Sequence, residues 1–255
     1  MHIDFWLLIK TVIGVSAIIA TGCVINNNFD QDIDRLMERT KNRPMAQGLI
    51  STAEALIFAF ILFIIGVITL FSINTLSLII ALIGLFFYIV VYTMLFKRNS
   101  IYGTLLGSIS GSTPPVIGYV AVTGRLDLGA ILLFLILTTW QMPHSYAIGI
   151  FRCDDYKNAK ISLLPVKKGF AITKKHMFFY IVLFAIANVL LSLCGYSGFL
   201  YLLTSLAFSI AWLYLCLQGF KLGNEDKPWA RKMFFFSIVC IIALSIMMAI
   251  NPAHP

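Results

Sequence analysis

Charged side chains are scarce in this sequence. Only 12% of its 255 residues are Asp, Glu, Lys or Arg, whereas 60% are hydrophobic and the mean hydropathy is +0.91. Soluble globular domains usually carry about 25% charged residues. The low charge content therefore excludes an ordinary soluble fold and predicts a polytopic membrane protein.

Paired cysteines are also lacking. The five cysteines, at positions 23, 153, 194, 216 and 240, show no close pairs and no zinc-finger spacing, which argues against a disulfide framework or a structural zinc site. We expect no cleavable signal peptide either, because the first apolar stretch is too long, has no basic start and runs into an acidic motif.

Eight apolar stretches are long enough, at roughly 20 residues each, to cross a hydrocarbon core of about 30 Å. They cover residues 5–27, 53–73, 76–96, 101–122, 128–150, 176–194, 197–219 and 230–250. We expect an all-α bundle of about eight transmembrane helices that forms a single domain over residues 1–255. Tandem prolines in the fourth stretch predict either a broken helix beside a cavity or a packing kink.

Cations are almost absent from one set of alternate loops. Of the 19 Lys and Arg residues, 17 fall in or beside segments 29–52, 97–100, 151–175 and 220–232, and only Lys10 and Arg125 fall elsewhere. Because cytoplasmic loops retain Lys and Arg, these segments are predicted to face the cytoplasm of a bacterial inner membrane. The net charge of +8 is then a topology signal, and we expect no nucleic-acid binding.

A polar stripe lies at the inner end of the first predicted helix. Asn26, Asp30 and Asp34 recur at four-residue intervals and so share one helical face. Carboxylates at that spacing repel, so flanking arginines or a bound divalent cation must compensate. Arg35, Arg39 and Arg43 repeat at the same spacing on the neighbouring face, provided that the helix continues that far.

A second polar region ends the fifth predicted helix. Gln141 and His144 lie at membrane depth beside Pro143, and the acidic pair Asp154 and Asp155 follows in the next loop. Two carboxylate clusters flanked by cations on one membrane face fit a phosphate ester held with Mg²⁺, which binds one or two protein carboxylates and completes its shell with water and phosphate. Apolar helices would solvate a hydrocarbon tail.

These motifs resemble a known family. Asn26-x-x-x-Asp30-x-x-x-Asp34, with Arg-Thr-Lys-Asn-Arg-Pro downstream, is similar to the first aspartate-rich motif of the UbiA family of intramembrane prenyltransferases. Segments 97–108, 114–119, 140–148 and 163–169 resemble the branch of that family that acts on haem. The resemblance implies a UbiA-like fold and Mg²⁺-dependent transfer of a farnesyl group from farnesyl diphosphate to a vinyl group of haem b, with addition of water.

The resemblance also implies site residues. Asn26, Asp30 and Asp34 match the first Mg²⁺-diphosphate motif, and Asp155 matches the second. The implied diphosphate-binding cations are Arg35, Arg39, Lys41, Arg43, Lys97 and Arg98. His144 and Gln141 fall in the haem-branch signature and are expected to address the haem. Haem A synthase and terminal oxidase assembly factors are the protein partners that such an activity implies.

Two positions depart from the family pattern. Asn27 stands where many members have Asp, and the first predicted helix corresponds to the second of the nine that the family normally has. We therefore expect this chain to lack the family's first transmembrane helix. Three other functions remain open: prenylation of an aromatic acid or quinone precursor, membrane transport, and a structural assembly role.

Overall fold

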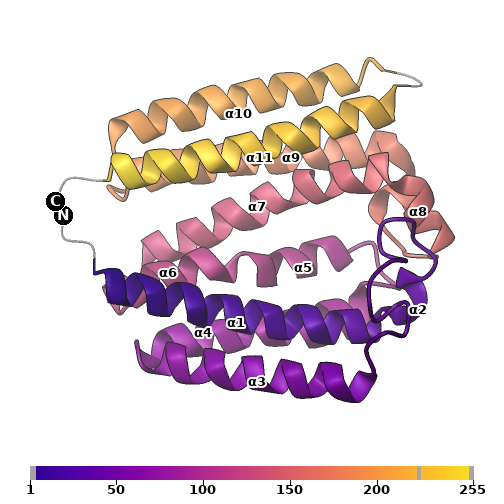
Figure 1. Ribbon diagram of the computed structural model, residues 1–255. Helices are drawn as coiled ribbons and strands as arrows, with labels where there is room; N and C mark the ends of the chain where they lie inside the picture. Colours follow the sequence, from indigo (N-terminus) through magenta and orange to yellow (C-terminus); the bar gives the residue numbers. More distant parts are fainter. Residues whose placement is uncertain (1–3, 223–224, 253–255) are drawn as a thin grey trace.

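The computed structural model describes residues 4–222 and 225–252, and the chain folds into a bundle of helices (Figure 1). The described elements are α1 (Phe5–Phe29), α2 (Gln31–Asp34), α3 (Thr52–Phe71), α4 (Thr75–Phe86), the π-helix η1 (Phe87–Phe96), α5 (Gly103–Gly111), α6 (Thr113–Thr123), α7 (Leu128–Phe151), α8 (Cys153–Asn158), α9 (Leu164–Leu193), α10 (Phe199–Gly219) and α11 (Asp226–Ile250). Eight spans in these ranges are long and apolar enough to cross a membrane, which confirms the all-α membrane bundle.

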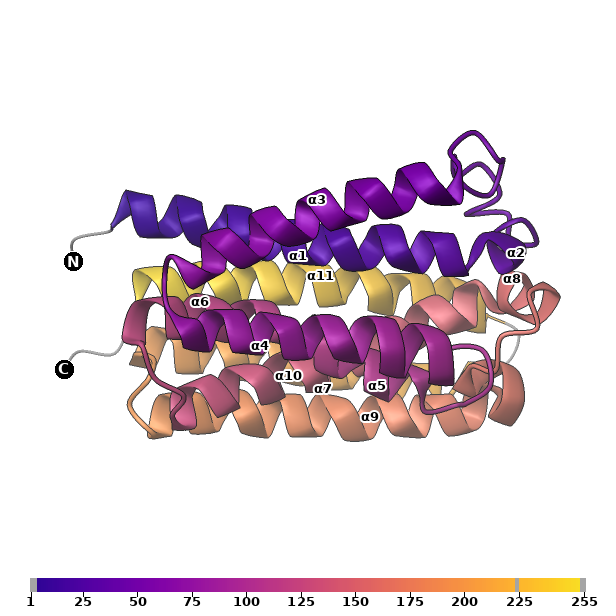
Figure 2. The same ribbon diagram turned by 90° about the horizontal axis from the view of Figure 1, so that it is seen from below.

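The bundle consists of two parts that meet at α7. Helices α1, α3, α4 and α6 pack on one another, and α7, α9, α10 and α11 form the other part (Figures 1 and 2). The second part contains the larger apolar core, with Met142, Phe184, Trp212 and Met233 fully buried at its centre. Because α5 packs on both η1 and α7, it joins the two parts.

The polar helices α2 and α8 lie at one end of the bundle, and short turns close the other end (Figure 1). At the other end Gly124 closes α6 with a φ of 67°, and Asp127 caps α7 by accepting a hydrogen bond from the Gly129 backbone N–H at 2.9 Å. The small helices α2 and α8 lie side by side at the opposite end of the bundle in both views (Figures 1 and 2). The two predicted acidic segments are therefore neighbours in space.

Two segments differ from the sequence-based spans. The sixth helix was expected from residue 176, but α9 begins at Leu164, with a break in helical geometry at Gly169 (φ 78°). Lysines in its first turns lower the hydropathy without ending the helix, so the predicted loop 151–175 was too long. The fourth span is interrupted at Ser112, which separates α5 from α6 just before the tandem prolines, as a broken helix requires.

The inner half of the third span is a π-helix. The Lys97 backbone N–H donates to the Tyr92 carbonyl at 2.8 Å, and the Thr93 hydroxyl donates to the Tyr88 carbonyl, also at 2.8 Å. The first bond joins backbone groups five residues apart, as π geometry demands, and the second ties the Thr93 side chain to the carbonyl five residues earlier. The wider turn stacks the rings of Tyr88 and Tyr92, with centroids 5.8 Å apart and planes at 18°. This segment places both tyrosines and Lys97 on one side of the bundle.

Candidate functional site

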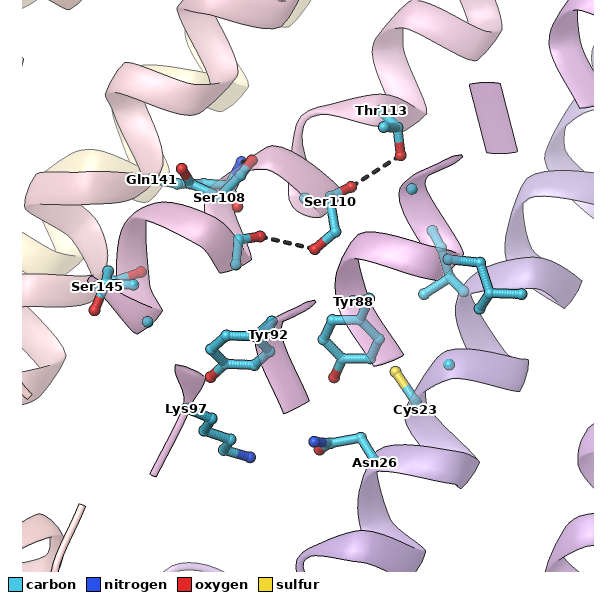
Figure 3. A pocket seen from close by; sticks show the side chains of 18 of the residues that line it. Cys23, Asn26, Tyr88, Tyr92, Lys97, Ser108, Ser110, Thr113, Gln141 and Ser145 are labelled. Atoms are coloured by element: carbon cyan, nitrogen blue, oxygen red, sulfur yellow. Dashed lines mark hydrogen bonds between the residues drawn. The ribbon is translucent and has the colours of Figure 1, made fainter. Parts of the chain in front are cut away.

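A cavity of about 570 Å³ lies between α1, α4, η1, α5 and α7. Its deep wall is apolar and includes Val15, Ile18, Ile19, Leu85 and Ile117. Its polar end is lined by Asn26, Asp34, Arg39, Arg43, Lys97 and Tyr156. In Figure 3 Asn26 and Lys97 point toward each other at this end, and the rings of Tyr88 and Tyr92 separate them from Ser110 and Gln141. The cavity therefore combines a charged entrance with a hydrocarbon-like interior.

The predicted polar stripe is continuous across the joint between α1 and α2. Asp30 N–H donates to the Asn26 carbonyl at 2.9 Å, and Asp34 N–H donates to the Asp30 carbonyl at 2.8 Å. Asp30 is fully buried, and its Oδ2 accepts a hydrogen bond from Asn26 Nδ2 at 2.8 Å and pairs with the Lys97 ammonium. The Thr93 hydroxyl also accepts from Asn26 Nδ2, at 3.0 Å. The stripe is thus anchored to η1.

Asp34 is held by a loop that returns to it. The chain does not continue as a helix beyond α2, so the expected basic stripe on a neighbouring helical face was wrong. The loop instead brings Arg43 back, and its Nη1 lies 2.7 Å from Asp34 Oδ2. Arg39 and Arg43 line the cavity. Arg35 donates from Nε to the Ala46 carbonyl at 2.7 Å, so it braces the loop.

Two of the predicted diphosphate cations bond to surface carboxylates. Lys41 pairs with Glu38 at 2.7 Å, and 70% of the Glu38 side chain is exposed. Arg98 makes two 2.7 Å bonds to the carboxylate of Asp32 and a third, at 2.6 Å, to the Phe29 carbonyl. The hydrogen bond from Arg98 holds the pKa of Asp32 below its usual value. Arg98 therefore fixes the corner between α1 and α2.

The segment that carries Asp154 and Asp155 packs against the segment that carries Asp34 through apolar side chains. Ile33 and Met37, from the first segment, pack with Ala159 and Ile161, which follow α8. Tyr156 on α8 lines the cavity, and burial raises its pKa. The neighbouring Asp155 carboxylate is partly buried and lies 3.7 Å from the Arg152 guanidinium, outside the set of residues that line the cavity.

The structure separates the two predicted haem-binding residues. Gln141 lines the cavity, and its Nε2 donates to the Ser112 hydroxyl at 3.0 Å. His144 faces α11 instead, where its ring stacks on Trp140 and its Nδ1 lies 2.7 Å from Ser237 Oγ. The two residues project from different faces of α7, so a haem contact for each of them remains a prediction.

Sequence reasoning gave no site role to three aromatic residues that line the cavity, and favoured a packing role for Tyr88 and Tyr92. Tyr88 and Tyr92 line the cavity from η1, and Tyr156 lines it from α8. The four-residue spacing of the first two, on an otherwise apolar span, was the available signal. Their π faces flank the path from the charged end to the apolar end.

The donor set at the polar end suits a metal that shares its shell with a phosphate ligand. In residues 4–222 and 225–252 no three His, Cys, Asp or Glu side chains converge as a complete metal site. Asp30 Oδ1 is nevertheless buried with no hydrogen-bond partner within those ranges, although Arg98 Nη2 forms an ion pair with it at 3.6 Å. A carboxylate oxygen left in this way, beside Asn26 and Asp34, fits Mg²⁺, which takes few protein ligands when substrate phosphates supply the rest.

Comparisons with known proteins agree with this geometry. Residues 1–239 match the model of the UbiA prenyltransferase family. The protoheme IX farnesyltransferase of Photorhabdus laumondii is 52% identical over 99% of this chain and 86% of that protein. The enzyme of the same name from Sodalis glossinidius is 50% identical over 98% of this chain and 84% of that protein.

Solved structures share the fold. A structure of digeranylgeranylglyceryl phosphate synthase has a TM-score of 0.81 at 25% identity and covers 98% of this chain and 87% of its own. A UbiA homolog from Archaeoglobus fulgidus bound to GPP and Mg²⁺ has a TM-score of 0.69 at 14% identity, covering 96% of this chain and 89% of its own. The chain belongs to the UbiA prenyltransferase family.

Proposed function

We propose that this protein transfers the farnesyl group of farnesyl diphosphate to a vinyl group of haem b, with addition of water, to give haem O. The two protoheme IX farnesyltransferases, similar over nearly the whole chain, support this substrate pair. The observation that carries the proposal is the cavity, which joins a cationic and carboxylate-bearing end to an apolar wall. An isoprenoid diphosphate has the same division between a charged head and a hydrocarbon tail.

The polar end is proposed to bind the diphosphate. Arg39, Arg43 and Lys97 line it and would neutralise phosphate charge. Lys97 pairs with Asp30 at the cavity wall, so it can exchange that carboxylate for a phosphate oxygen. Arg35 and Lys41 are then outer cations that stabilise the loop. Arg98 fixes the α1–α2 corner, and its Nη2 also lies 3.6 Å from Asp30 Oδ1.

Asn26, Asp30 and Asp34 are proposed to hold Mg²⁺, with Asp155 as the second-motif carboxylate. When bound, the ion neutralises charge on the departing diphosphate. Support comes from the buried Asp30 Oδ1, which accepts no hydrogen bond in the described residues and has only the Arg98 guanidinium, 3.6 Å away, as an ion-pair partner there. The Archaeoglobus fulgidus homolog, bound to GPP and Mg²⁺, has the same fold.

The reaction proceeds by loss of diphosphate, which takes the electron pair of the C1–O bond. The vinyl group of haem forms a bond from its terminal carbon to C1 of the farnesyl cation, and the positive charge moves to the other vinyl carbon. Water adds there and releases a proton. Tyr88 and Tyr92 present aromatic rings to the cavity, where π faces stabilise a cation. The apolar wall excludes water from the first cation.

Product mass tests the proposal. Membranes that contain the protein, given Mg²⁺, farnesyl diphosphate and haem b, should yield haem that has gained a farnesyl group and one water. An equimolar aromatic acid acceptor in the same assay should remain unmodified. Prenylation of the aromatic acid with unmodified haem would instead establish the alternative acceptor class.

Diphosphate release tests the site. Asp30→Asn and Asp34→Asn should abolish Mg²⁺-dependent diphosphate release from farnesyl diphosphate, because each removes a carboxylate from the stripe. Release at the wild-type rate would refute the catalytic assignment and favour a transport role. We also propose that this end of the bundle faces the cytoplasm of a bacterial inner membrane, and that haem A synthase or oxidase assembly factors accept the product.

A further inference from the structure

A row of four aromatic rings runs along the contact between α7 and α11. The rings of Trp140 and His144 stack with centroids 4.7 Å apart, and His144 lies 4.8 Å from Phe234. Phe234 in turn meets Phe151 edge-on at 5.7 Å. These four residues, here called the aromatic ladder, form a continuous series of rings that the chemistry of the diphosphate end does not use.

Guanidinium groups lie at the Phe151 end of the ladder. Arg231 Cζ lies 5.9 Å from the Phe151 ring centroid, and Arg152 Cζ lies 5.7 Å from it. The nearby Asp154 carboxylate is already paired with Lys227, and Asp155 lies 3.7 Å from Arg152. Arg231 is exposed and has no carboxylate within 4.0 Å among the residues that the structure describes. This guanidinium is therefore free to bind an external anion.

The ladder has a defined length. Its ends on α7, Trp140 and Phe151, lie about 16 Å apart along the helix axis, and the part from His144 to Phe151 spans about 10 Å. A groove lined by Phe151, Arg231 and Phe235 adjoins the charged end. A ligand that reaches from the charged end to His144 must be flat and apolar over about 10 Å and must carry negative charge at one edge.

The hydrogen bonding of His144 indicates which way such a ligand meets the ring. Ser237 Oγ donates to the Phe234 carbonyl at 2.6 Å, so toward His144 it can only accept. His144 Nδ1 therefore donates in their 2.7 Å bond, and Nε2 is the ring nitrogen left to contact a ligand.

The ladder lies next to the cavity. Gln141 and Ser145 each follow a ladder residue by one position and line the cavity from α7. Successive helical residues are about 100° apart, so the two surfaces occupy adjacent faces of one helix. A molecule on the ladder is then beside the prenyl-binding cavity.

We infer that the aromatic ladder is the docking face for the haem substrate and that Arg231 binds a haem propionate. The inference rests on the proposed function. Haem b is a flat apolar ring with both carboxylates on one edge, which matches a ladder with an unpaired guanidinium at one end. With the carboxylates at Arg231, the vinyl groups on the other half of the ring lie deeper in the bilayer, toward Trp140 and Gln141.

Removal of charge from either partner tests the contact. Arg231→Gln should raise KM for haem b tenfold or more at saturating farnesyl diphosphate, since loss of one charge-assisted bond typically costs a factor of about 10 to 100. Haem b dimethyl ester, whose carboxylates are blocked, should show a similarly high KM with the unaltered protein. Arg231→Gln should add little to the KM of the ester, and KM for farnesyl diphosphate should stay constant.

Lys175→Gln is the matched control, because Lys175 is an exposed cation on α9, at the same end of the bundle. It should leave KM for haem b unchanged, and Arg231→Lys should restore part of the affinity. Equal effects of Arg231→Gln on haem b and its ester, or no effect on haem b, would overturn the inference. An effect of Arg231→Gln on KM that depends only on the anionic phospholipid content of the vesicles would also overturn the inference, because Arg231 would then bind lipid headgroups.

A binding titration separates this inference from the proposed reaction. Haem b absorbance, followed without farnesyl diphosphate, should report weaker binding to Arg231→Gln than to the unaltered protein, with no difference for the ester. If the unaltered protein forms no farnesylated haem yet shows this pattern, the proposed reaction fails and the docking face stands. If it forms the product without the pattern, only the docking face fails.

Discussion

Two ion pairs of equal length in one loop provide a sharp test of the diphosphate end. Arg43 lies 2.7 Å from Asp34, and Lys41 lies 2.7 Å from Glu38. They differ in burial, because the Asp34 side chain is 6% exposed and that of Glu38 is 70% exposed. We predict that Arg43→Gln strongly weakens binding of farnesyl diphosphate, whereas Lys41→Gln has little effect.

The contacts set the magnitudes. Arg43 lines the cavity, where it is proposed to bind phosphate, and loss of one hydrogen bond to a charged group costs about 1.5 to 3 kcal/mol. Arg43 is itself 35% exposed, so solvent screening favours the lower half of that range, about 2 kcal/mol. That corresponds to roughly a 30-fold rise in KM. The exposed pair of Lys41 contributes between about 0 and 1 kcal/mol, so its removal should change KM less than about fivefold.

The assay is Mg²⁺-dependent release of diphosphate from farnesyl diphosphate by purified protein in lipid nanodiscs, with KM and kcat separated. Arg43→Lys should recover part of the loss, because it keeps the charge but not the planar fork. Equal losses for Arg43→Gln and Lys41→Gln would refute the reasoning, since they would show that net loop charge, and not the contact with Asp34, controls binding.

Three further perturbations have expected outcomes. Asp226→Asn should destabilise the protein by about 3 kcal/mol in detergent unfolding experiments, because it leaves the Lys174 ammonium, 6% exposed, without its charge partner. The pKa of Asp32 is lower in the folded state because of its hydrogen bond from Arg98, so lowering the pH below about 4 should remove the stability that this carboxylate contributes. Arg98→Gln should flatten that part of the pH–stability curve. Gly22→Ala should raise KM for farnesyl diphosphate several-fold in the diphosphate assay.

The glycine prediction has a matched control. A Cβ atom at Gly22 would lie 2.7 Å from Tyr88 Cδ1, so the tyrosine ring must move within the cavity. A Cβ atom at Gly118, in α6, has no heavy atom within 4 Å in the described structure. Gly118→Ala should therefore leave KM unchanged. Equal effects of the two variants would show that Tyr88 tolerates displacement.

Much of this architecture could be predicted from the sequence. Long apolar runs define the membrane helices because a bilayer requires them. The four-residue spacing of Asn26, Asp30 and Asp34 predicts a shared face, and their backbone hydrogen bonds keep that face across the α1–α2 joint. Local periodicity was sufficient for these features.

Contacts distant in sequence could not be predicted in the same way. The return of Arg43 to Asp34 depends on the path of an irregular loop, which no periodic pattern encodes. The early start of α9 was missed because Lys174, a cation that lowers hydropathy, is buried against Asp226 and the Gly219 carbonyl. The turning of His144 toward α11 depends on Ser237, 93 residues away.

The π-helical segment η1 has a consequence for insertions and deletions. A π-turn contains one more residue than an α-turn. If the same ten residues adopted ordinary α geometry, every later side chain would rotate by about 100° about the helix axis, and only deletion of one residue would restore the phase. Lys97 would turn away from Asp30, although its own residue type and its neighbours in the chain were unchanged. The length and geometry of this segment, and not its composition alone, therefore set the orientation of Lys97 relative to Asp30.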